Sequence, residues 1–320
     1  MLDRRELLTW GAAAAVPVVL GGRTMAARPA RRALVTADAE AHVAVVALDR
    51  ARVVGRIRTV ADPRSIERGP GGAVAIVGHA GSGAITLLDV AGPRVRRVLR
   101  GFAQPRYTAF TPDGRVAYVS DSGAGEVAVV DVVAGRVLRR VGVGDGARHL
   151  SLAPDGRTLW VALGSSAARI AVLDTRDARH PRLVAAVHPP LLAHDVAFSP
   201  SGRRVWVTGG RVGEVVVYSA FTRAVVRTLR ADRAPQHVSF GPAVAYVASG
   251  EGGTLAVHAL SDGHVRRRAR VPIGSYNVQR TGGVVLTPSL GTGALTVLDA
   301  HGRVTASARV AEHAHDACLA

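Results

Sequence analysis

Several residue types that often mark a function are scarce in this chain of 320 residues. Cys318 is the only cysteine, so the chain has no internal disulfide and no Cys-x-x-Cys metal-ligand pair. Lysine is absent, which excludes a phosphate-binding loop of the Gly-x-x-x-x-Gly-Lys type. No Gly-x-Ser-x-Gly nucleophile elbow occurs. Aromatic residues make up only 4% of the chain, and few stand among the arginines, so a base-stacking groove is not indicated.

An apolar stretch long enough to cross a bilayer is also missing from the N-terminal region. The stretch from Trp10 to Leu20 is shorter than the roughly 20 residues that a spanning helix needs. It follows the pair Arg4-Arg5 and precedes small residues at Ala26-Ala27, which is the order of an export signal. The paired arginines resemble a twin-arginine signal, which exports folded proteins. We predict an export signal at residues 1–32 and a mature chain outside the cell, in the cell envelope or in the periplasm; an uncleaved short anchor is the alternative.

Seven similar segments of about forty residues occupy the rest of the chain. Each contains an alternating apolar run that usually ends in Asp, and these ends lie 40 to 45 residues apart. The landmark positions are Asp49, Asp89, Asp131, Asp174, Ser219, Ala259 and Asp299. A period near forty with several short strands in each unit is typical of a β-propeller blade.

Residues 106–119 show the order within one segment. A strand of five residues is followed by the turn Pro112-Asp113-Gly114-Arg115 and by a second strand. The Asp-Gly pair favours a tight hairpin. With these turns, Ala117-Tyr118-Val119-Ser120 and Ala245-Tyr246-Val247-Ala248 resemble the YVTN-type β-propeller repeat family. The resemblance covers residues 33–320 and implies one all-β domain of seven four-stranded antiparallel blades; it leaves the function open, because propellers host many activities.

The ends of the repeat array are out of phase with the blades. Residues 34–60 supply the second, third and fourth strands of a blade, and residues 315–319 align with first strands. We therefore predict that the C-terminal strand pairs with the N-terminal blade and closes the ring, which leaves no open edge between the first and last blades. A closed ring of this kind is expected to be a monomer.

The first strand of each blade should lie innermost, with its leading residues at one mouth of the central channel. Alignment of the seven first strands gives two columns of residues. The first column is Arg64, Arg106, Arg148, His194, Gln236, Tyr276 and His315. The second column is Ser65, Tyr107, His149, Asp195, His237, Asn277 and Asp316. All of these except Ser65 and Gln236 are candidate ligand-binding residues.

Three interpretations of this mouth remain open. It is a wet polar funnel without a ligand, or a site for a small anionic ligand, since Arg64, Arg106 and Arg148 come from consecutive blades and guanidinium groups bind carboxylate and phosphate bidentately. The third is a transition-metal site. Its candidate ligands are His149, His194, His237 and His315, with Asp195 or Asp316 as a ligand or as a support for one.

The formal net charge of +17 raises the question of a nucleic-acid partner. Much of the arginine falls in predicted fourth strands, such as Arg139-Arg140 and Arg266-Arg267-Arg268, where charge blocks edge-to-edge pairing. This placement favours a structural role, and binding of nucleic acid through the basic surface is the weaker alternative.

A second resemblance concerns catalysis. Arg148-His149 followed by Pro154-Asp155-Gly156 is similar to repeats of lactonase-type propellers, which would imply a sugar-lactone hydrolase with Arg148 and His149 in the mouth. The acidic residue that often follows that family's Tyr-Val strand is absent. We expect an exported, non-catalytic propeller that binds a small ligand, a metal or a protein partner at the channel mouth. The alternative is a lactonase-like hydrolase acting at the same mouth; no catalytic residue is assigned.

Overall fold

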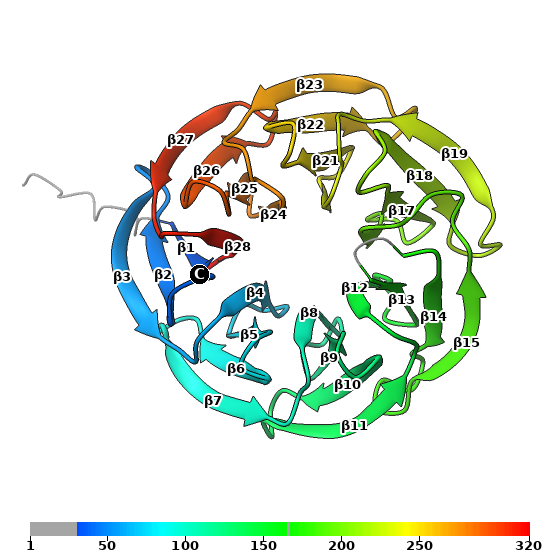
Figure 1. Cartoon of the computed structure of the whole chain (residues 1–320), viewed down its shortest axis with the longest axis horizontal. Helices are drawn as coiled ribbons and strands as arrows, with labels where there is room; N and C mark the ends of the chain where they lie inside the picture. The colour runs from blue at the N-terminus through cyan, green and yellow to red at the C-terminus, as the bar shows by residue number, and fades with distance from the viewer. Residues whose placement is uncertain (1–30, 165–166) are drawn as a thin grey trace, which may run out of the picture. The chain divides into compact units, whose positions relative to one another are not determined.

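A computed structural model describes residues 31–164 and 167–320. The predicted export signal, residues 1–32, lies almost entirely outside them. The described residues form 28 β-strands in seven sheets of four antiparallel strands, and they include no helix. The sheets are arranged as the blades of a ring around a common central axis (Figure 1). None of the described residues belongs to a helix that could cross a membrane.

Within each blade the strands follow one another from the channel outward. Blade 1 is β28 (Ala314–Leu319), β1 (Arg32–Ala37), β2 (His42–Ala47) and β3 (Arg52–Arg58). Blade 2 is β4 (Pro63–Arg68), β5 (Val74–His79), β6 (Ala84–Asp89) and β7 (Arg94–Arg100). Blade 3 is β8 (Pro105–Phe110), β9 (Val116–Asp121), β10 (Glu126–Asp131) and β11 (Arg136–Gly142). Blade 4 is β12 (Ala147–Leu152), β13 (Thr158–Leu163), β14 (Ile170–Asp174) and β15 (Arg182–Val187).

The remaining three blades have the same order. Blade 5 is β16 (Val196–Phe198), β17 (Arg204–Thr208), β18 (Glu214–Ser219) and β19 (Val225–Arg230). Blade 6 is β20 (Val238–Phe240), β21 (Val244–Ser249), β22 (Thr254–Ala259) and β23 (Val265–Arg270). Blade 7 is β24 (Gln279–Thr281), β25 (Val284–Pro288), β26 (Ala294–Asp299) and β27 (Val304–Arg309). The predicted fold class is confirmed.

The predicted closure of the ring is confirmed as well. β28 pairs with β1 in antiparallel register, with Ala33 opposite Leu319 and Leu34 opposite Cys318. All six residues of β28 are buried. Cys318 packs in a cluster with Leu34 and Ile66, so its thiol fills space near the channel axis.

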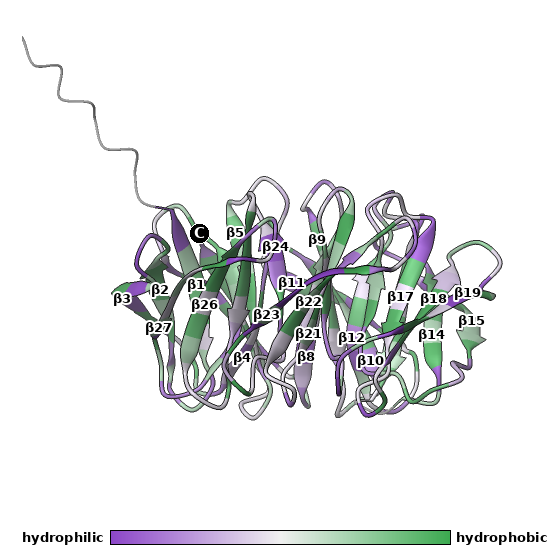
Figure 2. Cartoon of the chain, turned by 90° about the horizontal axis from the view of Figure 1, so that it is seen from above, coloured by the Kyte–Doolittle hydropathy of each residue, from purple (hydrophilic) through white to green (hydrophobic). Residues whose placement is uncertain are grey.

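The core lies between neighbouring blades. One cluster joins Tyr118 of blade 3 to Leu159 and Leu173 of blade 4, and another joins Val35 of blade 1 to Leu286 of blade 7. The interface that closes the ring is therefore packed like the others. In side view, strands such as β14 and β26 are largely hydrophobic (Figure 2).

The predicted Asp-Gly turn is present at the junction of the first and second strands. Gly114 has φ of +68°, a backbone conformation that residues with a side chain rarely adopt, and its amide donates to the Thr111 carbonyl. The equivalent Gly156 also has positive φ, and it lies against Pro112 of the preceding blade. The turns thus stack from one blade to the next.

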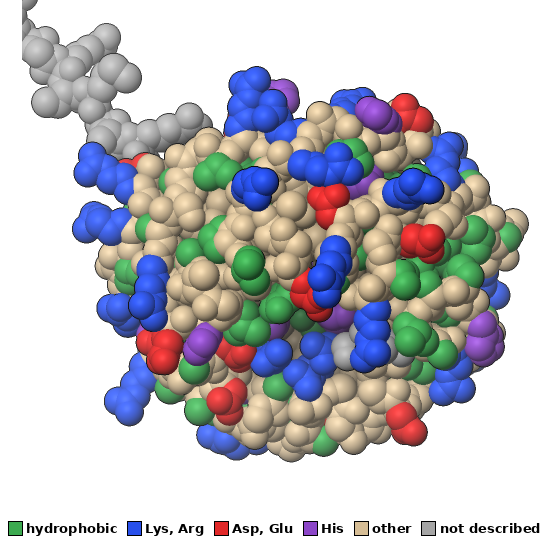
Figure 3. Space-filling view, turned by 45° about the horizontal axis from the view of Figure 1, so that its top comes forward, with side chains coloured by type: hydrophobic (Ala, Val, Ile, Leu, Met, Phe, Trp, Pro, Cys, Tyr) green, Lys and Arg blue, Asp and Glu red, His purple; other side chains and the backbone are tan. Residues whose placement is uncertain are grey.

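The outermost strands carry much of the arginine. β7, β11 and β23 are mostly exposed, and residues Arg266 to Arg268 follow one another along β23. Arginine side chains are spread over the visible face in Figure 3. Some form surface ion pairs, such as Arg268 with Asp232 at 2.8 Å. A row of charge along an outer strand opposes pairing with a second sheet.

Candidate functional site

The second-column residues and the arginines of the first column face different spaces at the channel mouth. Second-column residues line a cavity of about 630 Å³ in the channel, and they include Tyr107, His149, Asp195, His237, Asn277 and Asp316. The arginines of the first column line a separate cavity of about 510 Å³, and these are Arg64, Arg106 and Arg148. This division follows from strand geometry, because successive side chains on a strand point to opposite faces. His194 of the first column is an exception, because it precedes β16 and lies with His149 and His237.

Buried hydroxyl groups of second strands fix the backbone of the first strands. Thr208 accepts a hydrogen bond from the Asp195 amide at 3.1 Å and donates to the Gln236 carbonyl of the next blade at 2.6 Å. Thr36 likewise accepts from the Asp316 amide and donates to the Arg64 carbonyl. Neighbouring blades are thereby joined at the level where the column residues project. We expect these bonds to restrict how far the mouth can rearrange.

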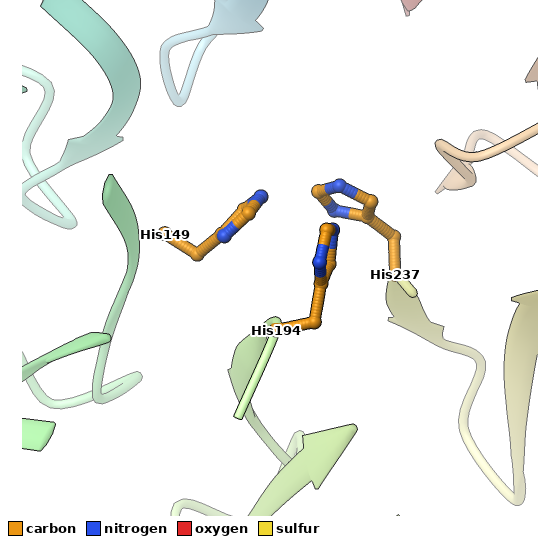
Figure 4. A group of neighbouring side chains, drawn as sticks. All are labelled: His149, His194 and His237. Carbon is orange, nitrogen blue, oxygen red and sulfur yellow. The ribbon is translucent and has the colours of Figure 1, made fainter. Parts of the chain in front are cut away.

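Three histidines from consecutive blades converge in the channel. His149 lies in β12 of blade 4, His194 precedes β16 of blade 5, and His237 precedes β20 of blade 6. One ring nitrogen of each lies within 4.8 Å of the others, and Figure 4 shows the three rings pointing toward a common space. The His149 ring centroid is 4.6 Å from that of His194 and 4.7 Å from that of His237.

His149 is the most buried member of this three-histidine cluster. Its side chain is 1% exposed, and neither ring nitrogen has a hydrogen-bond partner among the described residues. Burial, followed by the nearness of His194 and His237, holds the pKa of His149 well below its usual value. The pKa of His237 is also held well below its usual value, mainly by burial. Both imidazoles are therefore neutral at pH 7, the form that binds metal ions.

Asp195 and Tyr107 lie on either side of His237. The Asp195 carboxylate is 3.5 Å from His237 Nδ1, and it accepts hydrogen bonds from the amides of Val196 and Val238. The Tyr107 hydroxyl is 3.4 Å from His237 Nε2 and belongs to blade 3, so it reaches across the channel. Burial raises the pKa of Asp195 to about 7 and the pKa of Tyr107 to about 12.

Three more column residues, His315, Asn277 and Asp316, lie in or beside β28. His315 Nδ1 is 2.7 Å from the Arg64 carbonyl oxygen and 3.3 Å from Asn277 Nδ2. The Asp316 carboxylate accepts hydrogen bonds from the amides of Ile66 and Ala317, and burial raises its pKa to about 7. His315 thus lies outside the three-histidine cluster, and its Nδ1 contacts backbone.

Tyr276, another candidate from the first column, packs its ring against the backbone of Gly250. Its side chain lines neither of the two cavities.

One polar pair in the channel was not predicted from the sequence. Gln279 Nε2 donates to Glu67 Oε2 at 2.7 Å, and both residues line the channel cavity. Burial, followed by the nearness of Asp316, raises the pKa of Glu67 to about 8. The signal that could have predicted this pair is a third column of the same alignment. Glu67 and Gln279 stand there among small residues, which are Ala109, Ser151, Ala197, Ser239 and Cys318.

No protein-family model and no curated protein matches this sequence. Solved structures do match the fold. A chain described as Kuenenia stuttgartiensis hydrazine synthase superposes with a TM-score of 0.61 and 21% identity, over 74% of this chain and 76% of that one. The structure described as dihydro-heme d1 dehydrogenase NirN in complex with DHE superposes with a TM-score of 0.65 and 16% identity, over 88% of this chain and 64% of that one.

A functionally unknown protein from Desulfotomaculum acetoxidans superposes with a TM-score of 0.76 and 12% identity, over 90% of this chain and 98% of that one. Identities this low support the seven-bladed propeller fold alone.

Proposed function

We propose that this chain is an exported, ligand-binding propeller of the YVTN type that holds a divalent transition-metal ion on His149, His194 and His237. The carrying observation is the convergence of three imidazoles from consecutive blades, with ring nitrogens within 4.8 Å of one another. A buried polar group without a partner destabilises the folded state. Metal coordination would give the buried ring of His149 the partner that the described residues do not supply.

The donor set fits such an ion. Neutral imidazole suits zinc, copper, nickel and iron. With metal–nitrogen bonds of about 2.1 Å in a tetrahedral arrangement, the nitrogens would lie about 3.4 Å apart. Side-chain rotations that move the ring nitrogens by roughly 1 Å would bring them to that distance. Asp195 faces Nδ1 of His237, so it would orient this ring with Nε2 toward the metal, and Tyr107 lies beside the same nitrogen.

Elemental analysis of protein purified without chelator tests the proposal. We expect close to one equivalent of a transition metal, or uptake of one equivalent of Zn²⁺ or Ni²⁺ in a calorimetric titration. The variants His149→Ala and His194→Ala should lose uptake, while His188→Ala, outside the channel, should keep it. Less than about 0.2 equivalents in the native chain in both measurements would refute the metal site.

The lactonase-like hydrolase is retained as a second candidate for one reason. Three protein ligands would leave one coordination position open, as in catalytic zinc sites, and the metal would supply activation of water near pH 7. Turnover of a panel of sugar lactones, lost in His149→Ala, would support it. Absence of turnover in metal-loaded protein would leave the binding function as the sole proposal.

Export and monomeric state also belong to this proposal. The support is the paired arginines and apolar stretch of residues 1–32 and the closed ring. Fractionation of cells expressing the full chain should find it outside the cytoplasm, and the double variant Arg4→Ala with Arg5→Ala should stay in the cytoplasm. A cytoplasmic native chain would contradict export, and a dimer in size-exclusion chromatography would contradict the monomer.

A further inference from the structure

A second cavity lies beside the three-histidine cluster and has a different chemistry. Its volume is about 510 Å³, and arginine residues of three consecutive blades line it. They belong to Arg64 of blade 2, Arg106 of blade 3 and Arg148 of blade 4. Arg106 directly precedes Tyr107, and Arg148 directly precedes His149, so this arginine cavity is adjacent to the channel residues.

The charges around the arginine cavity are incompletely balanced. Arg64 is paired with Asp38, with 2.9 Å between Nη1 and Oδ2. Asp62 lies on the exposed rim of the same cavity. Within the described residues, no carboxylate lies within 4.0 Å of Arg106 or Arg148. The three arginines and two aspartates therefore leave a surplus of one positive charge, located at Arg106 and Arg148.

The partners of these two guanidinium groups are neutral or missing. Arg106 Nε donates to the Ser122 hydroxyl at 3.0 Å. Arg148 Nε is enclosed and has no hydrogen-bond partner in the part of the chain that the structure describes. Burial, followed by the nearness of Arg148 and Arg64, lowers the pKa of Arg106 to about 10. The two cations thus repel each other and lack the negatively charged acceptors that an anion would supply.

We propose that Arg106 and Arg148 form a binding site for a small oxoanion, either a carboxylate or a phosphate group. The planar guanidinium group presents parallel N–H donors that match two oxygens of such a group, and it remains charged when partly buried. The Arg64–Asp38 ion pair lines the same cavity and contributes no net charge to it. This site shares no residue with the three-histidine cluster, so it does not depend on a bound metal.

Calorimetric titration of the metal-free full chain tests the proposal with three probes, which are inorganic phosphate, succinate and chloride. We expect one site for phosphate or succinate, no saturable binding of chloride, and affinity that falls as salt is raised. Arg148→Met and Arg106→Met remove the charge while retaining much of the side-chain length, and each should weaken binding at least about tenfold. Arg227→Met, on the exposed strand β19, is the matched control and should bind as the native chain does.

The outcomes distinguish this site from the metal site. His149→Leu should keep oxoanion binding, even though it is expected to lose the metal. Binding of phosphate alone or succinate alone identifies the class of ligand, and either supports the site. Arg148→Lys keeps the charge without the paired donors, and we expect partial recovery relative to Arg148→Met. The proposal is overturned if neither anion binds at about 10 mM, or if Arg148→Met and Arg106→Met bind as tightly as the native chain.

Discussion

His149 provides a test of whether the cluster is a binding site or an ordinary part of the channel wall. The side chain is 1% exposed, and neither ring nitrogen has a partner among the described residues. A buried polar group left without a hydrogen bond costs about 1–3 kcal/mol. Leucine has a similar volume and no polar atoms. We therefore expect metal-free His149→Leu to be as stable as the native chain, or more stable by about 1–2 kcal/mol.

The chain contains a matched control for this substitution. His79 is 0% exposed, its Nδ1 is 3.0 Å from the Ala61 carbonyl oxygen, and its Nε2 is 2.8 Å from the Thr86 hydroxyl. His79→Leu removes two hydrogen bonds and leaves the buried Thr86 hydroxyl without a partner, whereas the Ala61 carbonyl keeps the Ser82 hydroxyl. We expect it to lower the free energy of unfolding by about 2–4 kcal/mol. The same substitution should therefore have opposite or sharply different effects at two buried histidines of one fold.

Denaturant and thermal unfolding with and without metal provide the readout. At a free metal concentration 100 times its Kd, the native chain should gain about 2.7 kcal/mol. For a domain of this size that corresponds to a rise in Tm of about 5 °C. His79→Leu should show the same rise from a lower starting point, and His149→Leu should show none. A metal-free His149→Leu as destabilised as His79→Leu would refute the reasoning and make His149 a structural residue.

Three further predictions address the ring and the channel. A chain that ends at Gly302 lacks β27 and β28 and should unfold or aggregate; a monomer with the native Tm would contradict the closure of the ring. Glu67→Gln should change how stability depends on pH, because the pKa of Glu67 is about 8 in the folded chain and about 4.3 in the unfolded chain. A carboxyl whose pKa is raised by folding makes the folded chain more stable at low pH than at high pH. The native chain should therefore lose stability as the pH rises from about 4.5 to 8. The full pKa difference would correspond to a loss of about 5 kcal/mol in the free energy of unfolding, and we expect about 1–2 kcal/mol because the side chain faces a cavity that admits water. If the stability difference between Glu67→Gln and the native chain were the same at pH 5 and pH 9, this prediction would be wrong. Thr208→Val removes the hydroxyl that joins Asp195 to Gln236 and should cost about 1–2 kcal/mol, measured by urea unfolding against the control Thr222→Val on an exposed turn.

The repeat period was sufficient to predict the blades, the hairpin turns and the closing strand. Each blade buries its faces against its neighbours, so the spacing of apolar runs reflects the architecture directly. The alignment of first strands also indicated several residues that line the channel cavity, whereas Tyr276 and the three arginines of the same alignment lie elsewhere. It could not indicate which of them meet, because that depends on how far each side chain extends across the ring. Tyr107 reaches His237 three blades away, whereas His315 turns to the Arg64 carbonyl.

Glu67 was missed for a related reason. The two columns nearest the mouth are polar, whereas the third column consists mostly of small residues, which do not indicate a site. Its two long polar members, Glu67 and Gln279, are separated by 212 positions in sequence and meet only because blades 2 and 7 flank blade 1. The predicted signal at residues 1–32 stays a prediction.

The pairing of β28 with β1 has a consequence for how the chain folds. It joins residues more than 280 positions apart, such as Ala33 and Leu319, whereas most other strand pairs are hairpins between near neighbours. Closing a loop of that length carries an entropy cost of about 5 kcal/mol. Blades 2 to 7 can form from local contacts, so ring closure should be the slow, late event. The channel lining is incomplete until β28 delivers His315 and Asp316, and the polar mouth therefore matures only when folding is finished.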